Sequence, residues 1–271
     1  MFEEHKVKTA DNYILNVFRI KKKEFTEPGA PVVFFQHGLL SCATTWIIHY
    51  PDIAPAFEMV RNGYDVWMGN NRGTTYSREH EFLNPDKDKA YWAYSFTELG
   101  DFDLPAQIDY VREQTGIEKV TYIGHSQGTT QMFYALATDY EYWEQRINLF
   151  VALAPVVHLG NTESIFIKMV SRLDGFGKWL FEKFSIGEVF RKGTVKDHGG
   201  FCRFIPFCTQ IAGFLDSVLN PMEDPGVSLV SSAHFPNGAS IQQLVHFGQL
   251  VKTGQFAYYD YGKQENMKHY R

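Results

Sequence analysis

The stretch "KVTYIGHSQGTTQ", residues 119–131, places a serine between two glycines directly after an apolar run. The bare pattern Gly124-x-Ser126-x-Gly128 arises by chance in roughly one chain in ten of this length, given about 7% usage of each residue type. Its context is more specific, because a strand-like run enters the pattern and a helical pattern leaves it. This arrangement predicts a nucleophile elbow on an α/β sheet, with Ser126 as the nucleophile.

The two glycines have a steric reason. A turn this sharp brings the strand and helix backbones together, so a side chain at Gly124 or Gly128 would collide. The backbone N–H of Gln127, directly after the serine, is predicted to donate to the oxyanion of a tetrahedral intermediate. The second donor is expected from the loop after "PVVFFQ", where Gly38 permits a close approach and the N–H of Leu39 follows it.

Polar residues near these donors are interpreted as structural. His37 precedes the serine, and a base at that point breaks the chain order of hydrolase triads, so we expect it to hold loop backbone by hydrogen bonds. Asn70, Arg72 and Gly73, in "GNNRGTTYSR", are likewise predicted to form a structural loop after a strand rather than to act as catalytic groups.

The remaining chain indicates an α/β protein. "HKVKTADNYILNVFRI" predicts two strands around a turn at Asp11-Asn12. Apolar runs at 31–36, 64–69, 119–124 and 149–154 predict strands covered on both faces, as in a parallel sheet. Helical patterns separate them, and one carries a capping box, Ser95 with Glu98, and a stop at Gly116. We therefore expect an α/β fold with a mostly parallel sheet.

The pattern changes near residue 157. From there helical spacing of apolar residues continues and no buried-strand run recurs, so residues 1–156 are predicted to form the core and 157–271 a helical cap or lid. A chain of 271 residues supports a large core. Its 16% aromatic content suits either a lipid ligand or an aromatic interior.

Charge and hydropathy exclude several classes of protein. The net charge of −5 argues against nucleic-acid binding. No apolar run is long enough to span a bilayer, since "INLFVALAPVV" at 147–157 is too short. The first residues have no apolar core and are not a signal peptide as given. Among the cysteines, Cys202 and Cys208 lie close enough in sequence to bridge, which would leave Cys42 over, and the default expectation is three free buried thiols.

Four linked motifs resemble one known family. "FFQHGLLSCATTW", "GYDVWMGNNRGTTYSREH", "FTELGDFDLPAQIDYVREQTG" and "YIGHSQGTTQ" are similar to the acid lipases, which include gastric lipase and lysosomal acid lipase. The resemblance covers nearly the whole chain. It implies an α/β-hydrolase core with a helical cap that hydrolyses triacylglycerols or steryl esters, with Ser126 at the nucleophile position and Leu39 and Gln127 as oxyanion donors.

The resemblance has further implications. It implies a lipid ester as the substrate, transient contact with a lipid interface, no metal or organic cofactor, and a secreted or lysosomal location. Family members carry a disulfide in the cap region of Cys202 and Cys208, although the spacing here is shorter than in the mammalian lipases.

The chain departs from this family at the Asp and the His of the catalytic triad. Both should follow the serine, with Asp before His, on loops after two more strands. The chain ends at Arg271, immediately after the segment that "QENMKHY" resembles, so the matching residues and strands are absent. Asp260 and His269 have the right order but are only nine positions apart. The remaining candidates are interpreted as solvated groups of cap helices or loops: Asp174, Asp197, Asp216, Asp224, His198, His234 and His246.

Three hypotheses follow from this departure. The chain is a fragment of a lipase, or a non-catalytic protein that keeps the crevice for a lipid, or a hydrolase that works through Asp260 and His269. Sequencing the transcript past codon 271 tests the first. Without its last strands the sheet is expected to have an open edge and poor solubility.

Overall fold

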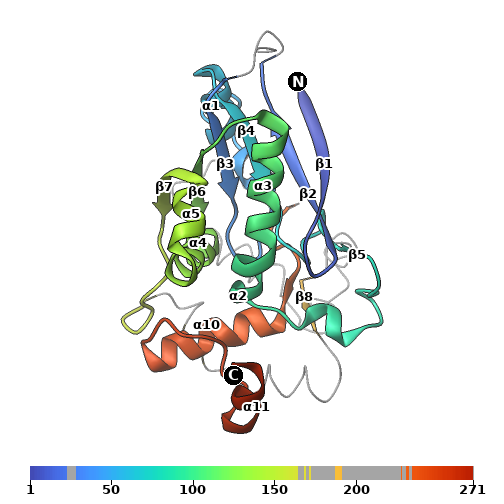
Figure 1. The fold of residues 1–271 in the computed structure, drawn as a ribbon, viewed down its shortest axis with the longest axis vertical. Coiled ribbons are helices and arrows are strands. Elements are labelled where there is room, and N and C mark those ends of the chain that lie inside the picture. Colours follow the sequence, from blue (N-terminus) through green and yellow to red (C-terminus); the bar gives the residue numbers. More distant parts are fainter. Residues whose placement is uncertain are drawn as a thin grey trace.

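A mixed sheet forms the centre of the protein (Figure 1). The computed structural model describes residues 1–22, 29–163, 168, 171, 187–190, 227, 230–231 and 234–270. Within these residues the main sheet has the strand order β1-β2-β4-β3-β6-β7, and β5 pairs with β2. Its strands are β1 (Phe2–Lys8), β2 (Tyr13–Ile20), β3 (Val32–Gln36), β4 (Asp65–Gly69), β5 (Glu79–His80), β6 (Val120–His125) and β7 (Ile147–Leu153).

The strand pairings confirm the predicted sheet. β4, β3, β6 and β7 run parallel to one another, whereas β2 is antiparallel to both β4 and β1. β1 and β2 join at a turn where Asn12 has φ 74°. All four apolar runs lie on these parallel strands. The order 4-3-6 matters for chemistry, because β3 and β6 are hydrogen-bonded neighbours and the loops that follow them lie at the same edge.

β7 is less covered than its apolar sequence predicts. Leu149 and Leu153 are 55% and 42% exposed, so the expectation of a strand covered on both faces is wrong here. Among the described strands β7 pairs only with β6, which places it at the edge of the sheet. A strand with one neighbour receives cover from fewer flanking elements than β3 or β4, whose residues are all buried.

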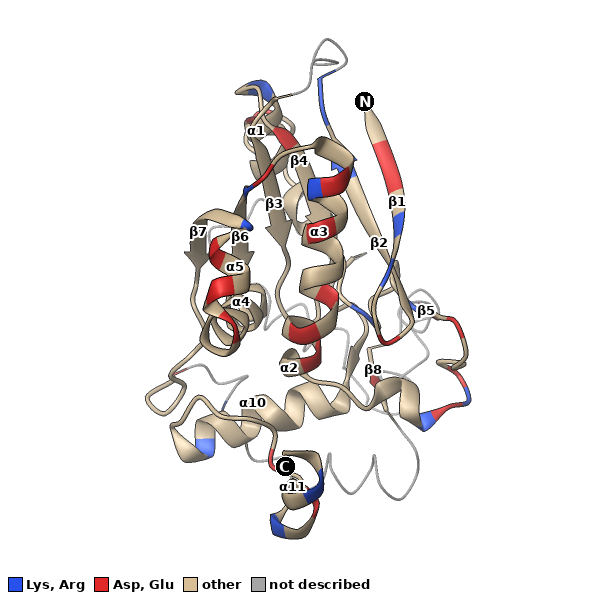
Figure 2. Cartoon of the chain, viewed as in Figure 1, with Lys and Arg blue, Asp and Glu red and all other residues tan. Residues whose placement is uncertain are grey.

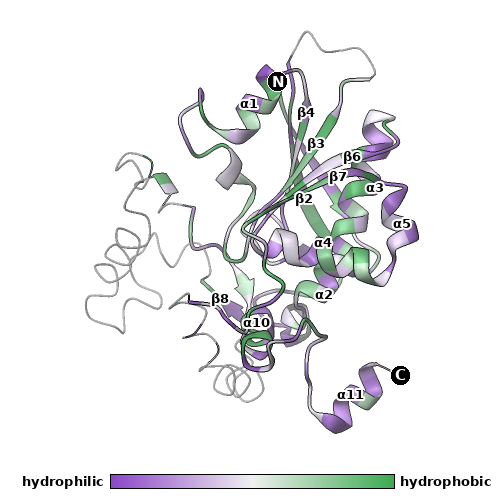
Figure 3. Cartoon of the chain, turned by 90° about the vertical axis from the view of Figure 1, so that its left-hand side faces the viewer, coloured by the Kyte–Doolittle hydropathy of each residue, from purple (hydrophilic) through white to green (hydrophobic). Residues whose placement is uncertain are grey.

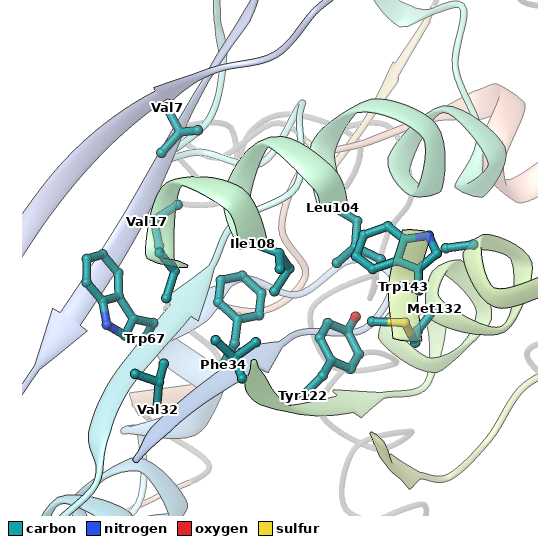
Figure 4. Close-up of a cluster of buried hydrophobic side chains, with 13 residues drawn as sticks. Val7, Val17, Val32, Phe34, Trp67, Leu104, Ile108, Tyr122, Met132 and Trp143 are labelled. Carbon is teal, nitrogen blue, oxygen red and sulfur yellow. The ribbon is translucent and has the colours of Figure 1, made fainter. Parts of the chain in front are cut away.

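Helices cover both faces of the sheet. The helical elements of the core are η1 (Ala43–Trp46), α1 (Pro55–Arg61), η2 (Lys89–Trp92), α2 (Phe96–Glu98), the π-helix η3 (Leu99–Asp103), α3 (Leu104–Thr115), α4 (Gln127–Thr138) and α5 (Tyr140–Glu144). Figure 4 shows Leu104 and Ile108 of α3 directed at Phe34 and Tyr122 of the sheet. Residues of η1 and α1 pack on the opposite face, against alternate side chains of the same strands.

Local signals explain the helix boundaries. Ser95 and Glu98 form the predicted capping box at α2, and Gly116 ends α3 in the left-handed conformation with φ 69°. The π-helix between α2 and α3 was not predicted, because it has no periodic signature of its own. Figure 3 shows hydrophobic residues concentrated on the central strands.

Residues beyond 157 add helices at one end of the sheet. The described elements there are β8 (Glu188–Val189), β9 (Ala239–Ser240), α10 (Ile241–Thr253) and α11 (Lys263–His269). In Figures 1 and 3 α10 crosses below the carboxyl ends of the strands, with α11 on its far side from the sheet. Lys252 is the only charged residue of α10 (Figure 2). The division into a core of 1–156 and a cap of 157–271 stays a prediction.

Candidate active site

Ser126 lies at the turn between β6 and α4. Its backbone has φ 52° and ψ −117°, a conformation that non-glycine residues rarely adopt. A Cβ atom added to Gly124 would lie 2.7 Å from the backbone of Gly128, and one added to Gly128 would lie 2.5 Å from the carbonyl oxygen of Gln36. The predicted collision is therefore confirmed at both glycines, but at Gly128 the backbone that it would meet belongs to the neighbouring strand β3 and not to the entering strand β6. The turn has the strand-turn-helix form of a nucleophile elbow.

The backbone of the elbow is held on both sides while its hydroxyl is left available. The N–H of Ser126 donates to Leu153 O at 3.0 Å, and its carbonyl accepts from the N–H of Thr129 at 2.8 Å. The Tyr122 hydroxyl donates to Gly128 O at 2.7 Å. Among the described residues, no side chain forms a hydrogen bond with the Ser126 hydroxyl. The half-buried serine can thus present its hydroxyl to a substrate.

The loop after β3 lies against this serine. A Cβ atom added to Gly38 would lie 3.1 Å from the Cβ of Ser126 and 3.2 Å from Nδ1 of His125. Leu40 has φ 59°, so the loop turns sharply just beyond Leu39. This approach is the one that the predicted oxyanion donor requires. The assignment of Leu39 and Gln127 as donors stays a prediction.

His37 holds the backbone of that loop, as predicted. Its buried ring lies with Nδ1 2.8 Å from Gly38 O, and its Nε2 accepts from the N–H of Asn71 at 3.1 Å. Because the Gly38 carbonyl can only accept and the Asn71 N–H can only donate, the proton of the neutral imidazole lies on Nδ1. Burial lowers the pKa of His37 to about 4, with His125 adding to this and the bond to Gly38 opposing it. With both nitrogens engaged, His37 is not a base for Ser126.

The His37 bond also orients the next peptide. A trans peptide is planar, and its C=O and N–H point in opposite directions. Because the Gly38 carbonyl is held by His37, the N–H of Leu39 is directed away from that imidazole.

Asn70 and Gly73 are structural, as predicted. The buried Asn70 side chain accepts from Ala43 N and donates to Asn16 O, each at 2.9 Å. Gly73 has φ 79°, and a Cβ there would overlap the Tyr94 hydroxyl. The loop after β4 is thereby fixed to its neighbours.

Arg72 is the charged centre of the same loop. It donates from Nε to Asp103 at 2.7 Å and from its two terminal nitrogens to Asp11 at 2.6 and 2.9 Å, and it lies over the ring of Tyr13. Burial raises the pKa of Asp103 to about 6, although Arg72 draws it down. Burial disfavours the Arg72 cation, but the two carboxylates outweigh this and raise its pKa. The guanidinium is committed to structure and not to a substrate.

Asp260 and His269 are not brought together as a triad pair. The Asp260 carboxylate accepts from Gly262 N at 2.8 Å and from Asn266 Nδ2 at 2.7 Å, which fixes the start of α11. His269 stacks on Tyr261 with ring centroids 4.1 Å apart. Both residues lie around α11, beyond α10 from the sheet (Figure 1).

His246 corrects the sequence interpretation, which placed it among solvated groups. The ring is fully buried and stacks on Phe96 at 4.1 Å, with Nδ1 2.9 Å from Ser95 Oγ and Nε2 2.9 Å from Ala257 O. Burial lowers its pKa to about 4. Its spacing from the buried Gln243 and Leu250 is the helical signal that could have revealed this.

The remaining His, Asp and Cys candidates from the sequence lie partly outside the described residues. His234 is half-buried in a turn. Cys42 is buried, with its sulfur 3.0 Å from Thr44 Oγ1. The following residues lie outside the described part of the chain: Asp174, Asp197, His198, Cys202, Cys208, Asp216 and Asp224.

Metal and membrane features can be judged for the described ranges. Within them no three His, Cys, Asp or Glu side chains gather in a way that could hold a metal ion. Nor does any described helix have the length and apolar character needed to cross a membrane.

Comparison with known proteins decides the family. A profile of the alpha/beta hydrolase fold matches residues 31–184, and one of a partial alpha/beta-hydrolase lipase region matches residues 1–50. Lipase member K of Homo sapiens is 38% identical over 280 residues, covering 99% of this chain and 68% of that protein. The chain belongs to the acid lipase family of α/β hydrolases.

Further relatives agree with this membership. Gastric triacylglycerol lipase of Bos taurus is 38% identical over 99% of this α/β hydrolase and 68% of its own length. Lipase lipl-1 of Caenorhabditis elegans is 38% identical over 97% of the chain and 67% of its own length. The crystal structure of epoxide hydrolase VrEH1 from Vigna radiata matches 93% of this chain and 73% of its own, with a TM-score of 0.50 and 15% identity. That structure bears on the fold alone.

Sequence reasoning missed two residues next to the predicted donors. Asn237, two residues before β9, bonds to the loop after β3, and Gln243, in the first turn of α10, bonds to Gln127. The capping box "SIQQ", with Ser240 and Gln243, is a signal that could have marked the helix start. The long-range contacts have no sequence signal.

Proposed function

We propose that this protein hydrolyses lipid esters through an acyl-Ser126 intermediate, with the backbone N–H groups of Leu39 and Gln127 stabilising the oxyanion. The observation that carries the proposal is the backbone of Ser126, at φ 52° and ψ −117°, in an elbow that Gly38 approaches closely. Strain of about 1–3 kcal/mol at a polar residue persists where the surrounding structure imposes it, and it is typical of functional sites. Membership of the acid lipase family supports the same chemistry.

The proposed reaction proceeds in two acyl transfers. The Ser126 oxygen forms a bond to the acyl carbon, its proton passes to a general base, and the carbonyl electrons move onto the oxygen that faces the two N–H donors. The ester C–O bond then breaks and the protonated alcohol leaves. Water cleaves the acyl-serine in the same way. Among the described residues, no histidine forms a hydrogen bond with the Ser126 hydroxyl.

The substrate class proposed is a triacylglycerol or a steryl ester. The names of two relatives, gastric triacylglycerol lipase and lipase lipl-1, support a lipid substrate. The surroundings of Leu39 support it too, since this residue packs against a buried apolar cluster that includes Phe96, Phe247 and Leu250. An ester with a long acyl chain is expected to be preferred to a charged or small polar one.

The test compares the 271-residue chain with its Ser126→Ala variant on nitrophenyl butyrate and on an emulsified triacylglycerol. We expect hydrolysis of both esters by the unsubstituted chain and its loss in the variant. Equal rates in the two proteins would rule out the nucleophile. Saturable binding of a lipid ester with no Ser126-dependent turnover would favour the non-catalytic lipid-binding alternative.

A further inference from the structure

We infer that Asn237, two residues before β9, and Gln243, in the first turn of α10, are positioning residues that hold the two oxyanion-donor segments. We call this pair the brace. The inference rests on the proposed function, since it assigns a role to residues that touch the predicted donors. Neither residue contacts the Ser126 hydroxyl through a hydrogen bond, so their effect is transmitted through the backbone that carries each N–H.

Gln243 holds the donor segment that follows the nucleophile. Its Nε2 donates to Gln127 Oε1 at 3.1 Å, and its Oε1 accepts from the N–H of Ser240 at 3.0 Å. Gln127 and Gln243 are each only 2% exposed. A buried amide that loses one of these bonds leaves a polar atom unsatisfied, so the contact resists displacement. The first residue of α4 is thus tied to the first turn of α10.

Asn237 holds the other donor segment. Its backbone N–H donates to Leu40 O at 2.6 Å, directly after Leu39 and at the residue with φ 59°. Its side chain is fully buried, and Oδ1 accepts from Thr75 N at 2.8 Å and from Gly238 N at 2.9 Å. The side chain therefore fixes where the Asn237 backbone lies, and that backbone fixes the loop after β3.

The segment between these two residues is itself held in place. A Cβ atom added to Gly238 would lie 2.5 Å from Gly73 O, so the segment fits closely over the loop after β4. Ser240 Oγ donates to Tyr94 O at 2.6 Å and accepts from Gln243 N at 3.0 Å. One short segment from a late part of the chain therefore contacts both halves of the predicted oxyanion hole.

Backbone donors make such support important. A side-chain donor can adjust by rotating, whereas a backbone N–H moves only when its peptide moves. Misplacement of a catalytic group by about 1 Å can lower the rate about a hundredfold. Loss of a brace contact should therefore lower kcat and leave substrate binding largely intact, because the oxyanion forms only in the transition state.

The first experiment pairs Gln243→Met with Gln242→Met in the full chain. Gln242 is the adjacent residue of the same helix and is also buried, but its Nε2 donates to the Tyr261 hydroxyl at 3.1 Å. We expect Gln243→Met to lower kcat for nitrophenyl butyrate at least about tenfold with KM within about twofold. Gln242→Met should leave both constants within about twofold. Circular dichroism checks that each variant is folded.

The second experiment tests Asn237 by conservative rescue. Asn237→Asp keeps an oxygen that accepts from Thr75 and Gly238 and loses only the long Nδ2 bond to His234 O at 3.4 Å, whereas Asn237→Ala removes all three bonds. We expect Asn237→Ala to lower kcat at least about tenfold and Asn237→Asp to retain most of it. Equal losses in both variants would contradict a role for the side-chain acceptor.

A third measurement separates the brace from the proposed function. Amide hydrogen exchange of peptides covering 37–41 and 125–129 needs no turnover. In Gln243→Met we expect faster exchange in the second peptide, and in Asn237→Ala in the first, with Gln242→Met unchanged. Unchanged exchange together with unchanged kcat in folded variants overturns the brace. Failure of Ser126→Ala to alter hydrolysis overturns the proposed function, while the exchange data still decide on the brace.

Discussion

Gly38 and Ser126 lie in contact although 88 positions separate them in the chain: a Cβ atom on Gly38 would be 3.1 Å from the Cβ of Ser126. The two residues follow β3 and β6, which are hydrogen-bonded neighbours in the sheet. A separation between 3.0 and 3.4 Å is tighter than nearly all real Cβ contacts. Any side chain at Gly38 must therefore move either the loop or the serine.

Gly38→Ala should lower both the hydrolysis rate and the stability. The methyl group can be accommodated by a shift of a few tenths of an ångström, which costs about 1–3 kcal/mol of packing energy. The same shift displaces the Leu39 N–H from the oxyanion, and we expect kcat to fall at least about tenfold. Steady-state kinetics beside urea unfolding measures both effects. If the variant has an unchanged kcat, the Leu39 N–H is not a donor of the oxyanion hole.

Replacement of Ser126 should reveal the strain at the elbow. Ser126→Ala keeps a Cβ atom at φ 52°, whereas Ser126→Gly removes it. Both variants should lose hydrolysis, but the glycine variant should be more stable than the alanine variant by about 1 kcal/mol, the strain released less the added entropy of an unfolded glycine. Urea unfolding of the two proteins supplies the comparison. An alanine variant equal to or more stable than the glycine variant would argue against strain at this residue.

Acid should destabilise the fold through two buried histidines. Burial lowers the pKa of His37 and of His246 to about 4 from 6.5. The folded state therefore binds a proton less readily than the unfolded chain. As a result, the contribution of these histidines to the free energy of unfolding is fully present above pH 6.5 and is lost as the pH falls toward 4. Each histidine accounts for about 3 kcal/mol of this loss at most.

The His246→Gln variant isolates one of these contributions. The free energy of unfolding of the variant should be lower than that of the unsubstituted protein at pH 7, and the difference should shrink as the pH falls from 6.5 to 4. The exposed His158, replaced in the same way, serves as the matched control and should not change the slope. A difference that stays constant across this range would show that His246 does not resist protonation.

Arg72→Met should be strongly destabilising. The substitution leaves the fully buried Asp103 carboxylate without its cation, and removal of one partner from a buried ion pair costs about 3–5 kcal/mol. Lys6→Met is the control, because the Lys6–Glu79 pair is exposed and such pairs contribute little. Chemical unfolding of both variants gives the comparison. Similar small losses in the two would indicate that the Arg72 cluster is hydrated.

The fold was predictable where local patterns carry it. Continuous apolar runs marked β3, β4 and β6 because a strand buried on both faces needs apolar side chains in both directions. The capping box at Ser95 and the left-handed Gly116 are local backbone requirements, and the structure contains both. The exposure of β7 was not predictable, since it depends on which element lies beside the strand and not on the strand itself.

The sequence by itself determined the elbow. Gly124, Ser126 and Gly128 meet within five residues, and the steric need for the two glycines follows from a turn of that length. Only the tertiary structure decided what surrounds it: the burial of His246 against Phe96, the pairing of Arg72 with Asp11 and Asp103, and the contact of Gln243 with Gln127. These contacts join residues 31 to 150 positions apart, and only the packing of the folded chain decides which of them meet.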